Sequence, residues 1–123
     1  MKRTFHLVGA EEWQPAGGLW RPASLEGQGF VHLSFAEQLQ GTLDLHFPGR
    51  GPLWLLEVDP GALENLVLEP SREDQLFPHL YGPLPAASVL RHWSLVPADG
   101  RHLAPTLGAQ AAEDEPAGKP GQP

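Results

Sequence analysis

A chain of 123 residues, 41% of them hydrophobic, is long enough to fold as one domain with its own core and too short for two. The absence of cysteine excludes a disulfide framework and thiolate chemistry, and it fits a reducing cytoplasm. The net charge of −7 and the scattered basic residues disfavour duplex nucleic acid as a partner, and no apolar run has the length of a membrane helix or the pattern of a signal peptide. We therefore expect a cytoplasmic protein with no membrane partner.

The hydrophobic pattern predicts one α+β domain over residues 1–96 rather than a doubly wound parallel sheet. A short helix is expected over residues 10–15, and a longer one over residues 34–47, where Phe35, Leu39 and Leu43 recur every four residues. The run PLWLLEVD is bounded by turn residues and is typical of a buried central strand. The predicted strands cover residues 4–8, 30–33, 52–59, 66–69, 77–81 and 88–96, and residues 19–22 are expected to be extended.

Residues 97–123 differ from the rest of the chain in composition. They are rich in Pro, Gly and Ala, contain an EDE run and have few large apolar side chains. Such a segment cannot bury enough surface to offset the entropy lost on ordering it. We expect it to be a disordered acidic tail with no chemical role.

Three of the predicted strands each carry one histidine. Successive side chains of a strand point to opposite faces, which places His6, His32 and His79 each opposite the aliphatic neighbours in its own strand. If these strands lie side by side, the three histidines line one cleft together with Ser34 and Tyr81. The alternative is that each histidine is a partly exposed strand residue with satisfied hydrogen bonds.

Two further residues each allow a structural and a ligand-binding interpretation. Ser34 and Glu37 have the spacing of a capping box, and the N-terminus of a capped helix also presents free N–H groups to a phosphate-bearing ligand. Trp20 is expected in the core, with stacking on a ligand as the alternative.

Other chemistries find little support. No two histidines have the short spacing that zinc sites usually take from one element, so no metal site is predicted. The Gly-x-Ser-x-Gly motif and the glycine patterns of nucleotide-binding loops are absent. Glu57, Asp59 and Glu69 are interpreted as strand-end charges, and Glu69 is the strongest candidate for another role because it lies between an apolar strand and a proline.

Two blocks of sequence carry a resemblance to a known family. Residues 29–34 have the form G-F-[IV]-H-x-S, and residues 77–84 read FPHLYGPL. Together with His6 on the first strand, these blocks resemble the domain of unknown function 952 family, small bacterial proteins sometimes labelled as glutathione S-transferase-related. The resemblance covers nearly all of residues 3–96. Neither a thioredoxin-like βαβ pattern nor a cysteine supports the glutathione label.

At the level of the fold, this family is similar to ADP-ribosyltransferase-like proteins, which bind NAD in a cleft of a split, twisted and mostly antiparallel sheet. The resemblance implies NAD as a substrate rather than a resident cofactor, with His6 at its ribose and His32 towards its nicotinamide side. A late-strand acid often completes such a site, and Glu69 matches that position only loosely. The expected catalytic residues are His6, His32, His79 and Glu69, and the expected ligand-binding residues are Ser34, Tyr81, Trp20 and Phe77.

Three interpretations of the function stay open. The protein is an enzyme acting on NAD or an ADP-ribosyl compound, a non-catalytic module that binds a small nucleotide-like ligand, or a structural or interaction protein without a ligand. In the first, His6 and His32 orient the ribose and diphosphate, Tyr81 stacks on the ligand, and His79 or Glu69 transfers protons, for which a side chain that titrates near neutral pH is suited.

Overall fold

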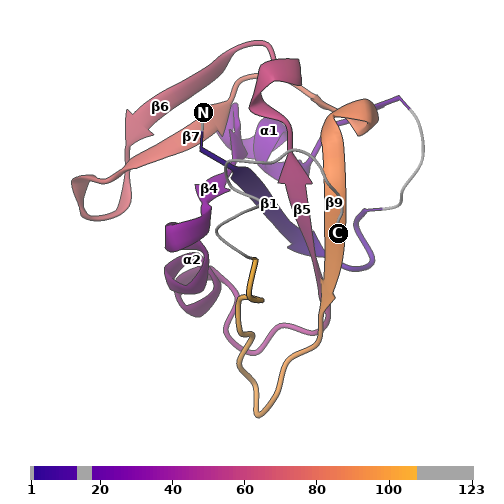
Figure 1. Ribbon diagram of the computed structural model, residues 1–123, viewed down its shortest axis with the longest axis vertical. Coiled ribbons are helices and arrows are strands. Elements are labelled where there is room, and N and C mark those ends of the chain that lie inside the picture. The colour runs from indigo at the N-terminus through magenta and orange to yellow at the C-terminus, as the bar shows by residue number, and fades with distance from the viewer. Residues whose placement is uncertain (1, 14–17, 108–123) are drawn as a thin grey trace.

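Nine strands in three antiparallel sheets and two α-helices make up the part of the chain that the computed structural model describes, residues 2–13 and 18–107 (Figure 1). The predicted α+β class with mostly antiparallel sheets and two short helices is confirmed. The elements are β1 (Thr4–Gly9), β2 (Leu19–Trp20), α1 (Ala23–Gln28), β3 (Val31–His32), β4 (Ser34–Phe35), α2 (Leu39–His46), β5 (Leu53–Val58), β6 (Leu66–Pro70), β7 (Leu76–Leu80), β8 (Leu84–Pro85) and β9 (Val89–Leu95).

The larger sheet has the strand order β4-β1-β5-β9, so β5 is a central strand, as its apolar sequence predicts. The two faces of this four-stranded sheet pack against separate hydrophobic cores, one with Phe5 and Leu55 and the other with Val8 and Leu56. This division arises because successive side chains of a strand point to opposite faces. His6 therefore shares the face of Val8, away from the core that contains Phe5.

The three-stranded sheet has the order β3-β7-β6, and its β6–β7 hairpin projects beyond the four-stranded sheet (Figure 1). Only Leu33 separates β3 from β4, so the chain passes from one sheet to the other at this residue. The Leu33 N–H donates to the Pro78 carbonyl at 3.0 Å, which holds the crossing point against β7. His32 pairs directly with His79 across β3 and β7. The junction of the sheets thus carries two adjacent histidines.

Two predicted helical features are wrong. Residues 10–12 form a turn rather than the start of a helix, and residues 14–17 lie outside the described residues. Ser34 belongs to β4 and is not a helix N-cap, because a 3-10 turn separates β4 from α2. The Phe35 N–H donates to the Gln38 side chain at 2.9 Å, and the Ser34 hydroxyl instead lies 3.2 Å from the Thr42 hydroxyl.

The helix α1 is absent from the sequence prediction. It follows Pro22 and ends at Gly29, whose φ of 89° lies in the left-handed region that glycine adopts without strain. Six residues are too few for a helical hydrophobic period to stand out from the neighbouring loops. The helix is relevant to the site because it supplies Ser24 and Gln28 to the cleft described below.

The packed chain extends beyond the predicted boundary at residue 96. His102 is 2% exposed and donates from Nε2 to the Gly51 carbonyl at 2.7 Å. The Gln40 side chain donates to the His102 carbonyl and accepts from the Ala104 N–H, and Leu107 packs against the core that contains Phe5. The composition of this segment did not predict its packing, because a few hydrogen bonds, rather than many apolar residues, hold it against the domain. The rest of the predicted tail, residues 108–123, lies outside the described residues.

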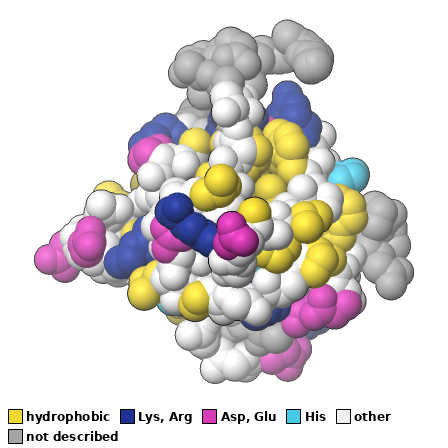
Figure 2. Space-filling view, turned by 90° about the horizontal axis from the view of Figure 1, so that it is seen from below, with side chains coloured by type: hydrophobic (Ala, Val, Ile, Leu, Met, Phe, Trp, Pro, Cys, Tyr) yellow, Lys and Arg dark blue, Asp and Glu magenta, His cyan; other side chains and the backbone are white. Residues whose placement is uncertain are grey.

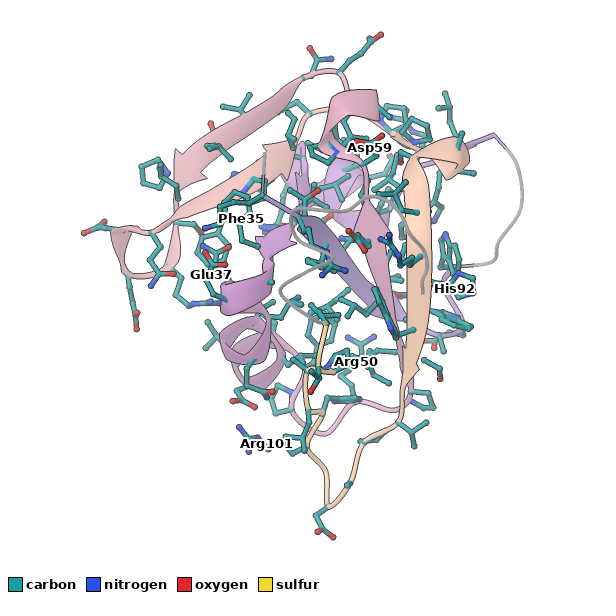
Figure 3. All side chains as sticks on the ribbon, in the orientation of Figure 1. Phe35, Glu37, Arg50, Asp59, His92 and Arg101 are labelled. Atoms are coloured by element: carbon teal, nitrogen blue, oxygen red, sulfur yellow. The ribbon has the colours of Figure 1, made fainter. Side chains whose placement is uncertain are left out.

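Glu57 is not a strand-end charge, because it is buried at 3% exposure and paired with two arginines. Arg3 donates to both of its carboxylate oxygens at 2.8 Å, and Arg91 donates to one of them. Asp59 does behave as expected for a strand end: it follows β5 and accepts the Gly61 N–H at 2.9 Å (Figure 3). The buried network is therefore structural, since each charge in it has a partner.

The surface charges are mixed rather than gathered by sign on the face seen in Figure 2, where acidic and basic side chains are interspersed with hydrophobic ones. Exposed ion pairs join Arg21 to Glu26 at 3.3 Å and Arg101 to Asp44 at 2.9 Å. Within residues 2–13 and 18–107, no helix has the length and apolar character needed to cross a membrane.

Candidate functional site

A cleft of about 370 Å³ is lined by residues of the four-stranded sheet, the three-stranded sheet and both α-helices. Five side chains predicted for the site contribute to its lining, namely His6, His32, Ser34, Phe77 and His79. They come from β1, β3, β4 and β7, which meet where the chain crosses between the sheets. The structure thus brings the three histidines into one cleft, while their chemical roles stay predictions.

Three other predicted site residues do not line this cleft. Glu69 and Tyr81 are connected to it through His79, as described below. Trp20 lies in an adjoining pocket of about 470 Å³ that shares His6 with the cleft, and its ring meets the His6 ring edge-on at a centroid distance of 5.4 Å. Trp20 can reach a ligand only if the ligand extends past His6 into this second pocket.

His6 is held as a neutral ring with a defined tautomer. Its Nδ1 lies 2.7 Å from the His32 carbonyl oxygen, which can only accept, so Nδ1 carries the proton and Nε2 keeps a lone pair. Burial lowers the pKa of His6 from 6.5 to about 4, although the hydrogen bond to His32 acts in the opposite direction. At neutral pH, His6 therefore offers the cleft a hydrogen-bond acceptor and no charge.

The Glu69 carboxylate orients the His79 ring through a hydrogen bond to Nδ1. The His79 Nδ1 donates to Glu69 Oε1 at 2.7 Å, and Tyr81 donates to the same oxygen at 2.6 Å. The hydrogen bond from Tyr81, followed by that from His79, holds the pKa of Glu69 below its usual value, so Glu69 is ionised at neutral pH. An ionised Glu69 can only accept, so Nδ1 of His79 carries a proton, and Nε2 is the ring nitrogen that is left without a partner among the described residues.

The free nitrogen of His79 is buried and has no hydrogen-bond partner among the described residues. The residue is 5% exposed, and its ring stacks on Phe30 at a centroid distance of 4.2 Å. Leaving such a nitrogen unpaired costs about 1–3 kcal/mol. Because His79 lines the cleft, a donor bound in the cleft would remove this cost.

His32 stands beside His79 and is the more exposed of the two. Its Nε2 donates to the Gln28 side chain at 2.6 Å, and its ring meets the His79 ring edge-on at 5.5 Å between centroids. Partial burial lowers the pKa of His32 below its ordinary value, and the nearby His79 and His46 act in the same direction. The sequence predicted on which side of its strand His32 lies. It did not predict the contact with Gln28, because Gln28 belongs to helix α1, which the sequence did not predict.

The lining of the cleft also contains hydrogen-bond donors. Arg72 donates to the Thr42 hydroxyl at 3.2 Å, and its guanidinium lies over the Phe77 ring at 4.8 Å from the centroid. The Thr42 hydroxyl is also 3.2 Å from that of Ser34. Arg72, Thr42, His46 and Gln28 are cleft residues that the sequence analysis missed. None of them belongs to a motif, and only the contact between the β6–β7 hairpin and α2 brings Arg72 to the cleft.

The lining of the cleft combines the histidine nitrogens of His6 and His79 with the guanidinium of Arg72 and the hydroxyl groups of Thr42 and Ser34. Among the described residues, no three His, Asp or Glu side chains are grouped closely enough to hold a metal ion. The side chains present are suited to proton transfer at His79 and to hydrogen bonding of a polar, anionic small molecule.

A family model described as "Protein of unknown function (DUF952)" matches residues 7–92 of the chain. The crystal structure of protein CC0527 from Caulobacter crescentus is similar, with 37% sequence identity, a TM-score of 0.73, and coverage of 82% of this chain and 93% of that one. A solution NMR structure of CC0527 matches with a TM-score of 0.67 at 37% identity, covering 82% of this chain and 91% of that one. No curated protein matches the sequence.

Proposed function

The chain belongs to the DUF952 family of proteins of unknown function, and we propose that it binds an NAD- or ADP-ribose-type nucleotide in the histidine cleft. The proposal includes an ADP-ribosyltransferase-like arrangement of the fold. It is supported by the crossing of the chain between two antiparallel sheets, by the cleft at this crossing, and by the first-strand His6 in its lining. The cleft has the size of a small-molecule site.

The single observation that carries the proposal is the unpaired Nε2 of His79 in a cleft that also contains Arg72. The nitrogen needs a donor, the guanidinium needs an acceptor, and a ribose joined to a phosphate offers both. The neutral His6, with its free Nε2, provides a second acceptor for a ribose hydroxyl.

The reaction that this site would perform is ADP-ribosyl transfer from NAD. A hydroxyl of the acceptor attacks the ribosyl carbon, the bond from that carbon to the nicotinamide nitrogen breaks, and nicotinamide leaves as a neutral molecule. The proton of the attacking hydroxyl passes to His79 Nε2, and the ionised Glu69 stabilises the imidazolium through Nδ1. Glu69 would then act through His79 rather than on the substrate.

Binding is tested by titrating the full chain, labelled with ¹⁵N, with NAD, ADP-ribose and nicotinamide. We expect saturable shifts of the amide resonances of His6, His32 and His79, and His79→Gln should weaken ADP-ribose binding by about tenfold or more. The control is His92→Gln, because His92 lies on β9 between Trp13 and Trp54 and outside the cleft (Figure 3). Equal losses in both variants would contradict the role of His79.

Turnover is tested by following nicotinamide release from NAD with the wild type and with Glu69→Gln. Release that falls in the variant while NAD binding persists supports catalysis. Binding without release by the wild type supports the non-catalytic module. A ligand at 100 times its Kd adds about 2.7 kcal/mol to the free energy of unfolding. If no nucleotide at millimolar concentration raises the temperature midpoint of unfolding, the enzyme and the non-catalytic nucleotide-binding module are both contradicted.

A further inference from the structure

Arg72 is fixed at the edge of the cleft by contacts that leave much of its hydrogen-bonding capacity unused. Its Nη1 donates to the Thr42 hydroxyl at 3.2 Å and its Nη2 to the Gln38 carbonyl at 3.4 Å. A guanidinium has five N–H groups, so three of those of Arg72 have no acceptor among the described residues. Stacking on Phe77 holds the group in place without satisfying any of them.

The neighbouring hydroxyl groups add a further donor. Ser34 is 5% exposed, and its hydroxyl shares one hydrogen bond with that of Thr42. Two hydroxyl groups have two protons, and this bond uses one of them, because Arg72 donates to Thr42 rather than accepting. The second hydroxyl proton has no acceptor among the described residues. The group formed by Arg72, Thr42 and Ser34 is therefore rich in donors and short of acceptors.

The guanidinium of Arg72 forms no ion pair with the described residues. Within the described part of the chain, no carboxylate lies at ion-pair distance from its guanidinium, although Arg21 and Arg101 each have one. Arg72 also differs from these two in contributing to the cleft. A charged group that lines a cleft, with unused donors and no paired anion, favours an anionic ligand.

Gly41 on α2 allows the guanidinium to lie where it does. A Cβ at residue 41 would be 3.0 Å from Arg72 Nη2, tighter than most Cβ contacts, so the guanidinium would have to shift by a few tenths of an ångström to accommodate a side chain there. This contact offers a way to displace the guanidinium without changing its charge.

We propose that Arg72, Thr42 and Ser34 form a subsite for a phosphoryl group, and that the unpaired Nε2 of His79 in the same cleft receives a hydroxyl of the same ligand. The inference rests on the proposed function in that it assigns the nucleotide's diphosphate to this group of residues. The recognised chemistry is a phosphorylated sugar with a free hydroxyl. Arginine matches the geometry of phosphate oxygens through two parallel N–H bonds, and the hydroxyls add a third contact.

The test measures the affinity of the full chain for three probes: sodium pyrophosphate, ADP-ribose and nicotinamide riboside, which has no phosphate. We expect Arg72→Gln to weaken pyrophosphate and ADP-ribose binding by about tenfold or more, Gly41→Ala to weaken both to a smaller degree, and neither variant to change nicotinamide riboside binding. Gly41→Ala replaces a helical glycine with a better helix former, so a loss of binding in this variant does not reflect unfolding. The control is Arg101→Gln, which removes the same charge from an exposed ion pair with Asp44 outside the cleft.

The possible results separate this inference from the proposed function. Pyrophosphate binding that depends on Arg72, without binding of ADP-ribose, supports the subsite and overturns the nucleotide proposal. ADP-ribose binding that is equally strong in the wild type and both variants overturns the subsite and supports the nucleotide proposal. A wild type that binds neither pyrophosphate nor ADP-ribose overturns both. A loss in Arg101→Gln as large as that in Arg72→Gln overturns the subsite, because net charge alone then explains the effect.

Discussion

Acidification below neutral pH should destabilise the protein through His6. The side chain is 6% exposed and its Nδ1 donates to the His32 carbonyl, so the folded state holds the ring in its neutral form. Burial lowers the pKa of His6 to about 4, whereas the unfolded chain keeps the ordinary value of 6.5. Between these pH values the unfolded chain binds a proton that the folded chain does not. The free energy of unfolding therefore falls as the pH decreases across this window.

The magnitude follows from the two pKa values. The interval from 6.5 to about 4, at about 1.4 kcal/mol per pH unit, corresponds to about 3 kcal/mol. This contribution is fully present above pH 6.5, declines as the pH falls, and is lost near pH 4. A domain of this size is stable by about 5–15 kcal/mol, so one histidine accounts for a substantial part of the acid sensitivity.

The assay is urea unfolding of the wild type and of His6→Asn at several pH values from 7.5 down to 4. Asparagine retains an N–H donor near the position of Nδ1 but does not titrate, and the carboxylates titrate alike in both proteins. We expect the wild type to lose about 3 kcal/mol more than the variant over this range. A stability difference between the two proteins that is the same at every pH would refute a buried neutral His6.

Three further predictions concern the hydrogen bonds outside the cleft. Glu57→Gln should cost about 3–5 kcal/mol in urea unfolding, because it removes the buried carboxylate that pairs with both Arg3 and Arg91; a cost below about 1 kcal/mol would contradict this. Tyr81→Phe should raise the pKa of Glu69 towards its usual value, as measured by carboxyl NMR, since the bond from Tyr81 is the main cause of its low pKa; an unchanged titration would show that the bond is unimportant. His102→Ala should destabilise the protein by about 2 kcal/mol or more, because the ring is 2% exposed and bonded to a backbone carbonyl; a neutral result would place the end of the packed chain before this residue.

The strands and the facing of the histidines could be predicted because they depend on local pattern. Apolar runs and a period of two residues identify a strand and the side of it on which each residue lies. The central position of β5 and the placement of His6 away from Phe5 followed from this rule alone. The same rule placed His32 and His79 correctly, and their pairing needed only that β3 and β7 be neighbours.

The remaining parts of the site could not be predicted because they depend on contacts between distant segments. Arg72 reaches the cleft through the hairpin that places it over Phe77 and against α2, thirty residues from Thr42 in sequence. The pattern around Ser34 matched a helix cap, but β1 pairs with this residue and draws it into a strand. For Ser34, pairing between strands overrode the local preference for a helix cap, and for Arg72 no local pattern indicated its position at all.

The segment His32–Ser34 explains why one cleft can hold both kinds of chemistry. His32 is the last residue of β3 in the three-stranded sheet, and its carbonyl accepts from His6. Ser34 belongs to the four-stranded sheet, and its hydroxyl contacts that of Thr42, to which Arg72 donates. Leu33 between them is 2% exposed, and its N–H donates to the Pro78 carbonyl of β7, so the covalent chain and one backbone hydrogen bond set the distance between His32 and Ser34. A ligand that contacts both His6 and the Ser34 hydroxyl would therefore meet them at a spacing fixed by the backbone of this segment.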